Sequence, residues 1–253
     1  MESEKDQLYK KVLRMKCSLI FAPYQYGINI VRRWDYGIKL ERIPFKTRGL
    51  RGMSYPGTKP EPDIILLNSK RSEIEQNFDC AHELVHLAIH RNLNKQVFNC
   101  FDKSTSPNQD PYLEWQANEG AAEFFVPYKF FIPLLKECVG NNPKRGDIEE
   151  FKRYAADLCC VPPAVIKYRI ESLKYEILQY YSGININDLQ IISKRQQERI
   201  GLYIKSLNEI GYNDNFDICS YIKMKNRSGW NQNGFHIDLL LPDRSGRYTL
   251  SRK

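Results

Sequence analysis

The sequence lacks any long apolar segment. No run of about 18 consecutive apolar residues occurs in the 253-residue chain, so no membrane-spanning helix is expected. Residues 1–24 mix acidic and basic side chains and hold no apolar region typical of a secretion signal. These absences predict a cytoplasmic protein with no membrane partner.

A disulfide framework is also lacking. The seven cysteines are odd in number, irregularly spaced and free of any C-x-x-C pair, so reduced and mostly buried thiols are expected. Cys80 lies two residues before His82, but a third ligand from the same helical turn would be badly aimed at a shared metal ion.

The chain has no internal repeat and no run of like charges. Its formal net charge is +8, but the basic residues are scattered along the sequence. Scattered charges are typical of a solvated surface, whereas a nucleic-acid-binding face needs a basic patch. A nucleic-acid partner is therefore not favoured.

Short apolar runs and periodic segments predict a mixture of helices and strands. The run Ile64–Leu67 indicates a strand, and Ser72 with Glu75 forms the S-x-x-E capping box that starts a helix. Asp110 and Pro111 start another helix, which Pro127 ends. The segments 49–62 and 93–110 are rich in turn residues and are expected to be loops. The other predicted elements are helices at 4–17, 129–138, 147–158, 162–176 and 187–210, strands at 28–31 and 38–43, and a β-rich tail at 212–253.

The most informative segment is H-E-L-V-H at residues 82–86. The chain has only four histidines, so this pattern is rare by chance. Two imidazoles at positions i and i+4 face the same way on a helix and can bind one metal ion. Glu83 between them would then lie beside an open coordination position, where it can take a proton from water. The motif predicts zinc-dependent hydrolysis.

A catalytic zinc site of this kind needs a third protein ligand. His90 is two turns beyond His82, about 12 Å of helix rise, which is too far to share the ion with both motif histidines. Glu114, 28 residues after His86, is the better candidate because it lies on a predicted helix. Asn118, one turn later, can hydrogen-bond a metal-bound imidazole.

The two segments HELVHLAIH and EWQANEGAAEFFVP together resemble the ImmA/IrrE family of metallo-endopeptidases. That family has H-E-L-G-H followed by E-x-x-A-N-x-F-A-A-x-L-L-M-P, and the similarity extends over roughly residues 15–175. The resemblance implies His82, His86 and Glu114 as ligands of one Zn²⁺ per chain, with Glu83 as general base. Three residues depart from the pattern, none of them a ligand or the base: Val85 replaces glycine, Gly120 replaces phenylalanine and Val126 replaces methionine.

The resemblance and the pattern along the chain together predict the fold and its organisation. We expect an α+β protein with a zincin-like helical core and a small, mostly antiparallel sheet. The predicted division is a metallopeptidase core at 1–140, a helical region at 141–211 and a small β-rich appendage at 212–253. An extended substrate is expected to align with an edge strand formed by Ile64, Ile65, Leu66 and Leu67.

Three functions are consistent with these observations. The first is a zinc endopeptidase, whose substrate the resemblance implies to be a helix-turn-helix repressor of a mobile element or stress response. The second is a non-enzymatic regulator that uses the zinc fold to bind protein or DNA, suggested by the net charge and the paired helices at 147–176. The third is a toxin-like partner in a two-gene system.

Overall fold

The fold is described from a computed structural model for residues 3–18, 29–31, 37–58, 60–93, 97–102, 109–141 and 144–210. The chain divides into two compact units. The sheet unit comprises Leu8–Pro127 and Ala156–Val165, and the helical unit comprises Met1–Gln7, Tyr128–Ala155 and Ile166–Lys253. Helices and one small sheet confirm the α+β class. The predicted division at 140 and 211 stays a prediction, and the tail at 212–253 lies outside the described residues.

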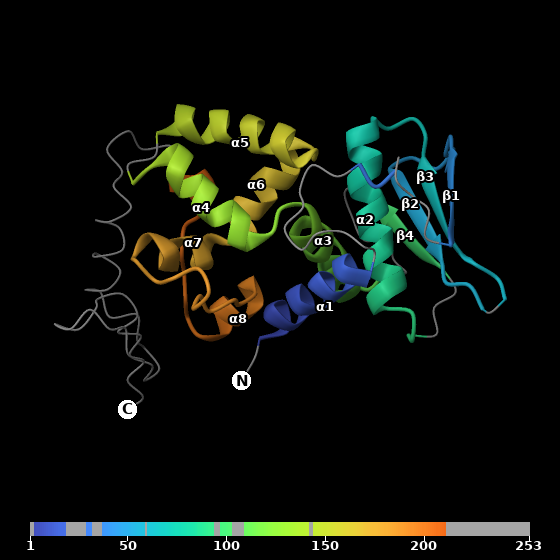
Figure 1. The fold of residues 1–253 in the computed structure, drawn as a ribbon, viewed down its shortest axis with the longest axis horizontal. Coiled ribbons are helices and arrows are strands. Elements are labelled where there is room, and N and C mark those ends of the chain that lie inside the picture. Colours follow the sequence, from blue (N-terminus) through green and yellow to red (C-terminus); the bar gives the residue numbers. More distant parts are fainter. Residues whose placement is uncertain are drawn as a thin grey trace. The chain divides into compact units, whose positions relative to one another are not determined.

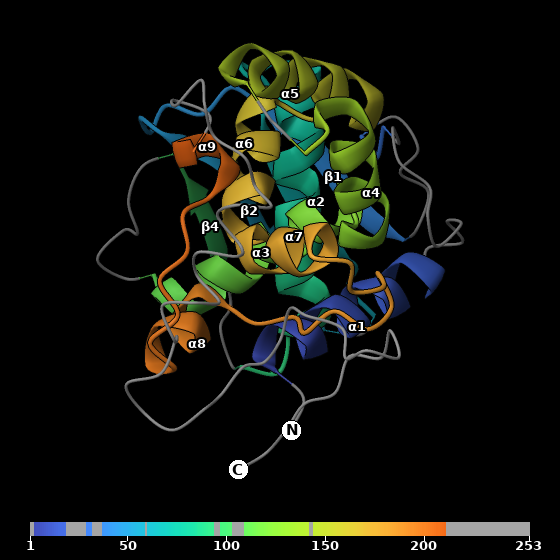
Figure 2. The same cartoon turned by 90° about the vertical axis from the view of Figure 1, so that its left-hand side faces the viewer.

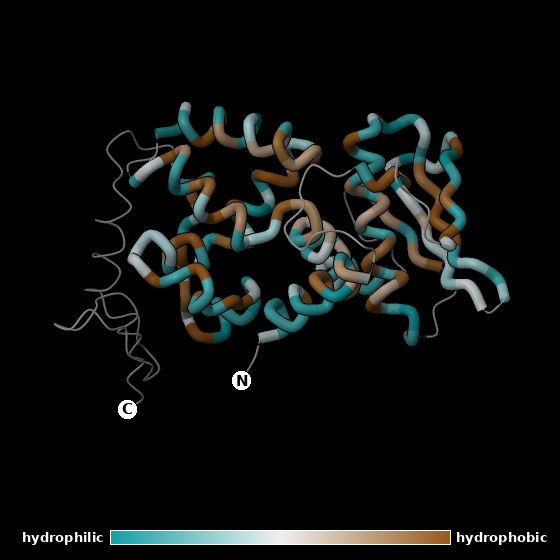
Figure 3. The backbone as a smooth tube through the Cα atoms, viewed as in Figure 1, coloured by the Kyte–Doolittle hydropathy of each residue, from teal (hydrophilic) through white to brown (hydrophobic). Residues whose placement is uncertain are grey.

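The sheet unit contains a four-stranded sheet with the order β1-β3-β2-β4 (Figure 1). Its strands are β1 (Ile38–Ile43), β2 (Leu50–Tyr55), β3 (Asp63–Asn68) and β4 (Phe98–Phe101). Only β1 and β3 are parallel, which confirms a mostly antiparallel sheet. Strand β3 is largely hydrophobic (Figure 3). Its residues Ile65 and Leu67 are completely buried, as expected for alternate residues on a core-facing side.

The expected role of Ile64–Leu67 as an exposed edge strand is wrong. These residues lie in β3, which pairs with β1 on one side and with β2 on the other. Their backbone groups are therefore occupied in the sheet, and β3 cannot accept a substrate strand by β-augmentation. Among the described strands, the edges are β1 and β4.

Three further expectations for local structure are wrong. The segments expected to be loops contain β2 and β4. β2 pairs with β3 and with β4, and β4 lies more than 40 residues beyond β2 in the sequence. The strand expected at 28–31 is instead a turn where it is described. There the side-chain oxygen of Asn77 accepts hydrogen bonds from the backbone N–H groups of Ile30 and Val31.

Helix α2 (Glu73–Ile89) lies against one face of the sheet and packs on β2, β3 and β4 (Figures 1 and 2). It starts where predicted, because both hydrogen bonds of the Ser72–Glu75 capping box are present. Helix α3 (Pro111–Phe125) packs on α2 and begins with Asp110, whose side chain accepts the N–H of Tyr112 at 2.8 Å. Because the sheet and α3 both cover α2, its residues are buried continuously from Gln76 to Leu87.

Val85 and Gly120 lie against one another at the interface between α2 and α3. A Cβ atom added to Gly120 would lie 3.0 Å from Cγ2 of Val85 and 3.2 Å from its Cγ1. Both residues are buried. The valine thus fills the space that a larger residue at 120 would need, which reverses the small and large partners of the family pattern.

We expect Gly120→Phe to destabilise the fold by about 3 kcal/mol or more, because overpacking a dense interface costs about 1–3 kcal/mol even for smaller additions. Val85→Gly in the same chain should recover part of the loss. Urea unfolding of both single variants and the double variant measures the coupling, expected at about 0.5–3 kcal/mol. Strictly additive losses would show that the two positions do not compensate.

Helix α1 (Glu4–Ser18) contributes its residues up to Gln7 to the helical unit and its residues from Leu8 to the sheet unit. Within the sheet unit, the Tyr9 hydroxyl donates to Glu119 Oε1 at 2.5 Å. Lys16 Nζ donates to the carbonyl oxygen of Phe124 at 2.6 Å, at the C-terminal end of α3 where carbonyls lack helical partners. Burial lowers the pKa of Lys16 to about 8.

The helical unit is held by contacts between segments distant in sequence. Lys5 Nζ lies 3.0 Å from Glu176 Oε1, and both side chains are almost fully buried. The rings of Phe131 and Phe151 lie 5.6 Å apart. The remaining helices are α4 (Tyr128–Val139), α5 (Arg145–Cys159), α6 (Pro163–Ser172), α7 (Lys174–Tyr181), α8 (Lys194–Arg199) and α9 (Leu207–Ile210). Of these, α5 and α6 contribute residues to both units.

A single helix at 187–210 was expected, and this prediction is wrong. A capping box at Ser193 starts α8, and the helix ends before Gly201, whose φ of +69° is incompatible with continued right-handed helix. No helix in the described part of the chain is long and apolar enough to cross a membrane.

Candidate metal centre

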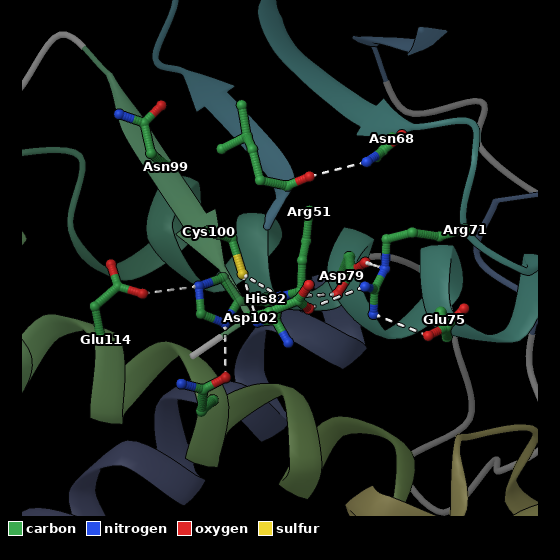
Figure 4. Close-up of polar contacts among 12 residues, drawn as sticks. Arg51, Asn68, Arg71, Glu75, Asp79, His82, Asn99, Cys100, Asp102 and Glu114 are labelled. Atoms are coloured by element: carbon green, nitrogen blue, oxygen red, sulfur yellow. Dashed lines mark hydrogen bonds and ion pairs between the residues drawn. The ribbon is translucent and has the colours of Figure 1, made fainter. Parts of the chain in front are cut away.

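Two packed helices bring the predicted ligands together. His82 and His86 lie one turn apart on α2, and their Nε2 atoms are 3.1 Å from each other. Glu114, in the first turn of α3, has Oε2 at 3.4 Å from His82 Nε2 and Oε1 at 3.5 Å from His86 Nε2. Figure 4 shows Glu114 reaching His82 from the neighbouring helix.

These separations match a tetrahedral zinc site. Zinc bonds of about 2.0–2.2 Å to nitrogen and oxygen place neighbouring ligand atoms about 3.3–3.6 Å apart. The observed distances of 3.4 and 3.5 Å lie in this range, and the third, 3.1 Å between the two imidazole nitrogens, is slightly shorter. Both imidazoles are completely buried, whereas the Glu114 side chain is 14% exposed. The donor set therefore fits a zinc ion with three protein ligands and a fourth position for water.

Asn118 lies where it can orient His82. Its Oδ1 is 3.1 Å from His82 Nδ1. Because an amide oxygen only accepts hydrogen bonds, Nδ1 carries the hydrogen and Nε2 directs its lone pair toward Glu114 and His86. Metal-binding histidines generally hydrogen-bond through their second ring nitrogen in this way.

Glu83 is completely buried beside the candidate ligands. A Glu83 carboxylate oxygen lies within 4.8 Å of a His82 ring nitrogen, a separation that one water molecule can bridge. Oε2 accepts a hydrogen bond from the Ser54 hydroxyl at 2.6 Å, and Oε1 has no hydrogen-bond partner among the described residues. Burial raises the pKa of Glu83 well above its usual value, while the Ser54 hydrogen bond opposes the shift. A raised pKa suits a group that must take and release a proton.

Strand β2 approaches Glu83 closely because residue 52 is glycine. A Cβ atom there would lie 3.1 Å from Glu83 Oε1 and 3.3 Å from its Cγ. Gly52 and Ser54 therefore affect the Glu83 carboxylate in two ways. Gly52 leaves room for it, and Ser54 binds one of its oxygens.

Ser54→Ala is expected to lower the hydrolytic activity that the H-E-L-V-H motif predicts by about tenfold, because a hydrogen bond to a charged group contributes about 1.5–3 kcal/mol. The hydrogen bond stabilises the ionised carboxylate and lowers its pKa, so its loss should move the acidic limb of the pH–rate profile to higher pH. Ser54→Thr, which keeps the hydroxyl, serves as the control. An unchanged profile in the alanine variant would argue against this role.

A β-bulge directs Arg51 toward α2 and β4. The pairing of β2 with β4 shifts register between Leu50 and Gly52, which places Arg51 at the irregularity. Arg51 Nε lies 3.1 Å from Cys100 Sγ and 3.5 Å from Asp79 Oδ1, while Arg71 Nε lies 2.7 Å from Asp79 Oδ2 (Figure 4). Burial raises the pKa of Asp79, and the two arginines oppose the shift. These contacts link α2 to strands β2 and β4.

A second set of ligand types, His82, Glu83 and Cys100, also lies within 4.8 Å. The Arg51 guanidinium donates to Cys100 Sγ and places a positive charge where a metal ion would have to approach. Burial also raises the pKa of this thiol well above its usual value, which disfavours the thiolate that binds metals. The geometry therefore favours His82, His86 and Glu114.

Sequence reasoning did not identify the residues that surround Glu83 and the histidines from the sheet. Arg51, Gly52 and Ser54 lie in β2, and Cys100 lies in β4, both of which were expected to be loops. The alternation of buried and partly exposed residues in F-N-C-F, confirmed by burial at Phe98 and Cys100, was a signal for β4. His90, expected to be a neighbour of the site, is buried with its Nδ1 2.9 Å from His86 Nδ1, and burial lowers its pKa.

Comparison with known proteins identifies the family. The model of the peptidase M78 family, described as an IrrE N-terminal-like domain, matches residues 34–171, more than half of the chain. No curated protein matches the sequence. The matched region contains α2 and α3 with all three candidate ligands, and it supports a metallopeptidase type of function. By this match the chain belongs to the ImmA/IrrE family of metallopeptidases.

Proposed function

We propose that the protein is a zinc-dependent endopeptidase, with His82, His86 and Glu114 as ligands of one zinc ion. The observation that carries this proposal is the convergence of two imidazole nitrogens and a carboxylate at 3.1–3.5 Å in a buried position. Such a group of electron-pair donors is costly without a cation between them. Glu83, with one carboxylate oxygen unpartnered among the described residues, stands beside it.

In this proposal Glu83 is the general base and then the general acid. Zinc in the site would polarise the scissile carbonyl and lower the pKa of bound water to about 7. Glu83 takes a proton from the attacking water and passes it to the leaving amine. Ser54 holds Oε2 of Glu83 at 2.6 Å, and Oε1, which has no hydrogen-bond partner among the described residues, is available for both proton transfers. Asn118 keeps the lone pair of His82 Nε2 directed into the site.

The substrate is proposed to be a helix-turn-helix repressor of a mobile element or stress response, a proposal supported by the family to which the chain belongs. An extended segment of this substrate would pair with β4 in place of β3, because β4 is an edge strand in the described sheet. Phe98 of β4 stacks on His86 with ring centroids 4.5 Å apart, so β4 runs directly beside the candidate ligands.

The experiment combines the purified protein with the repressor encoded by the neighbouring gene. Wild-type protein purified without any chelator should contain about one zinc ion per chain. It should also produce defined fragments, identified by mass spectrometry, and Glu83→Gln should not produce them. Zinc-free wild-type protein, or identical fragments from both proteins, would contradict the proposal.

A non-enzymatic regulator is the second candidate. It is favoured by α5 and α6, two helices joined by a short turn at residues 160–162 in a chain with a net charge of +8. In that case the Glu83→Gln variant would keep the full cellular output of the wild type. A toxin-like partner in a two-gene system would use the same chemistry. The identity of the neighbouring gene distinguishes this alternative from the first proposal.

A further inference from the structure

A chain of hydrogen bonds leads from His86 to the outer side of α3. His86 Nδ1 lies 2.9 Å from His90 Nδ1, and His90 Nε2 lies 2.9 Å from Gln116 Oε1. Gln116 Nε2 then donates to the Tyr112 hydroxyl at 3.2 Å. Tyr112 is 41% exposed, whereas His86 and His90 are buried. The network therefore connects a candidate metal ligand to a side chain in contact with solvent.

The orientation of the Gln116 amide determines where every hydrogen in this network lies. Gln116 Oε1 can only accept, so His90 Nε2 carries a hydrogen and the neutral ring leaves Nδ1 as an acceptor. His86 Nδ1 must then donate to His90 Nδ1. The other ring nitrogen, His86 Nε2, then carries no hydrogen and presents its lone pair 3.1 Å from His82 Nε2 and 3.5 Å from Glu114 Oε1. A reversed amide would instead place the hydrogen on His86 Nε2 and prevent metal binding there.

Packing restricts the His86 ring as well. Its face stacks on Phe98 with an interplanar angle of 17°, and its edge contacts the ring of His82 at a centroid distance of 4.9 Å. With Nδ1 bound to His90, His86 has little freedom to rotate away from Glu114. His82 receives the equivalent support from a direct hydrogen bond to Asn118.

We propose that His90 and Gln116 are positioning residues that hold His86 in its metal-binding tautomer. The proposal rests on the proposed zinc-dependent function, because it assigns His86 Nε2 to the metal. His90 itself is not a ligand, since it meets His86 on the side of the ring opposite to Nε2. A histidine in this position is a neutral acceptor, in contrast to the carboxylates and carbonyls that more often support metal-bound imidazoles.

The test measures zinc affinity by competition with a chromophoric chelator, together with the visible absorption spectrum of the cobalt-substituted protein. His90→Phe removes the acceptor but keeps an aromatic ring, and its Kd for zinc should rise about 10–100-fold, as for other residues that support metal ligands. His90→Asn places an acceptor near the position of Nδ1 and should restore most of the affinity. Tyr203→Phe is the control, because it removes a hydroxyl from a side chain that is 73% exposed and outside the network, and its Kd should stay within about twofold of wild type.

A second measurement needs no variant. In the zinc-bound wild-type protein, long-range ¹H–¹⁵N correlation spectra should show His86 protonated at Nδ1 and His90 protonated at Nε2. A His90 ring protonated at Nδ1 would overturn the proposal, and so would a folded His90→Phe variant with wild-type zinc affinity and cobalt spectrum. If His90→Phe fails to fold, Gln116→Met tests the same network from the less buried α3 side, and unchanged zinc affinity there would also overturn it.

These results separate the inference from the proposed function. A wild-type protein that binds zinc with the expected tautomers but cleaves no substrate would refute the endopeptidase and leave the positioning network standing. A wild-type protein that binds no zinc would refute both.

Discussion

Glu83→Gln is expected to lower kcat/KM by about 10²–10⁴-fold, the usual contribution of general acid–base catalysis, while leaving zinc content unchanged. The amide has nearly the same shape as the carboxylate, and its oxygen can still accept the Ser54 hydroxyl bond seen at 2.6 Å. It cannot take a proton from water. Steady-state kinetics with a peptide substrate and zinc analysis of the same sample measure the two quantities.

The variant should also be no less stable than the wild type. The ionised Glu83 is completely buried, with Glu114 and Asp79 adding further negative charge nearby, so the neutral amide removes an unfavourable charge. Glu41→Gln makes the same chemical change at a partly exposed position of β1 and should leave kcat/KM unchanged. A Glu83→Gln enzyme that retains more than a tenth of wild-type activity would show that the proton acceptor is another group.

Glu114→Ala is expected to raise the Kd for zinc by about 10²–10³-fold. The free energy of zinc binding to four-ligand sites is about 10–16 kcal/mol, so one protein ligand contributes roughly 2.5–4 kcal/mol. Each tenfold change in Kd corresponds to about 1.4 kcal/mol. His82 and His86 alone leave two coordination positions to water. Chelator competition measures the affinity, and peptide cleavage should fall to the level of the metal-free protein.

Thermal unfolding provides an independent readout of the same change. At a zinc concentration 100 times the Kd, bound zinc stabilises the wild type by about 2.7 kcal/mol, so added zinc should raise its Tm. The Glu114→Ala variant should show little response at that zinc concentration. Glu150→Ala removes an equal charge from an exposed position of α5 and should respond like the wild type. An identical zinc-dependent rise in Tm for Glu114→Ala would mean that the third ligand lies elsewhere.

The placement of the H-E-L-V-H motif on a helix could be predicted in detail, because it depends on residues that are close together in the sequence. The Ser72–Glu75 capping box involves residues three apart, and it starts α2 where the sequence indicated. The i, i+4 spacing of His82 and His86 determines that they share a face on any helix. Asp110 and Pro111 similarly locate the start of α3 at Pro111, three residues before Glu114.

The sheet could not be predicted as well, because its strands depend on distant partners. β2 pairs with β3 and with β4, and β4 is more than 40 residues away from β2 in the sequence. Gly52 disfavours a strand by local propensity, yet at this position it provides the space that Glu83 occupies. The single helix expected at 187–210 is wrong because of local features. The capping box at Ser193 starts a new helix there, and the positive φ of Gly201 ends it.

The sequence by itself determined the identity of the chemical groups: two histidines and a glutamate on one helix, and a second glutamate with its asparagine on the next. Spacing along a helix is sufficient for this, because helical geometry is the same in every protein. Only the tertiary structure decided what surrounds these groups. Ser54 on Glu83, Arg51 on Cys100 and the network from His86 through His90 to Gln116 each join residues from different elements. Such contacts depend on how sheet and helices pack, and no local pattern specifies them.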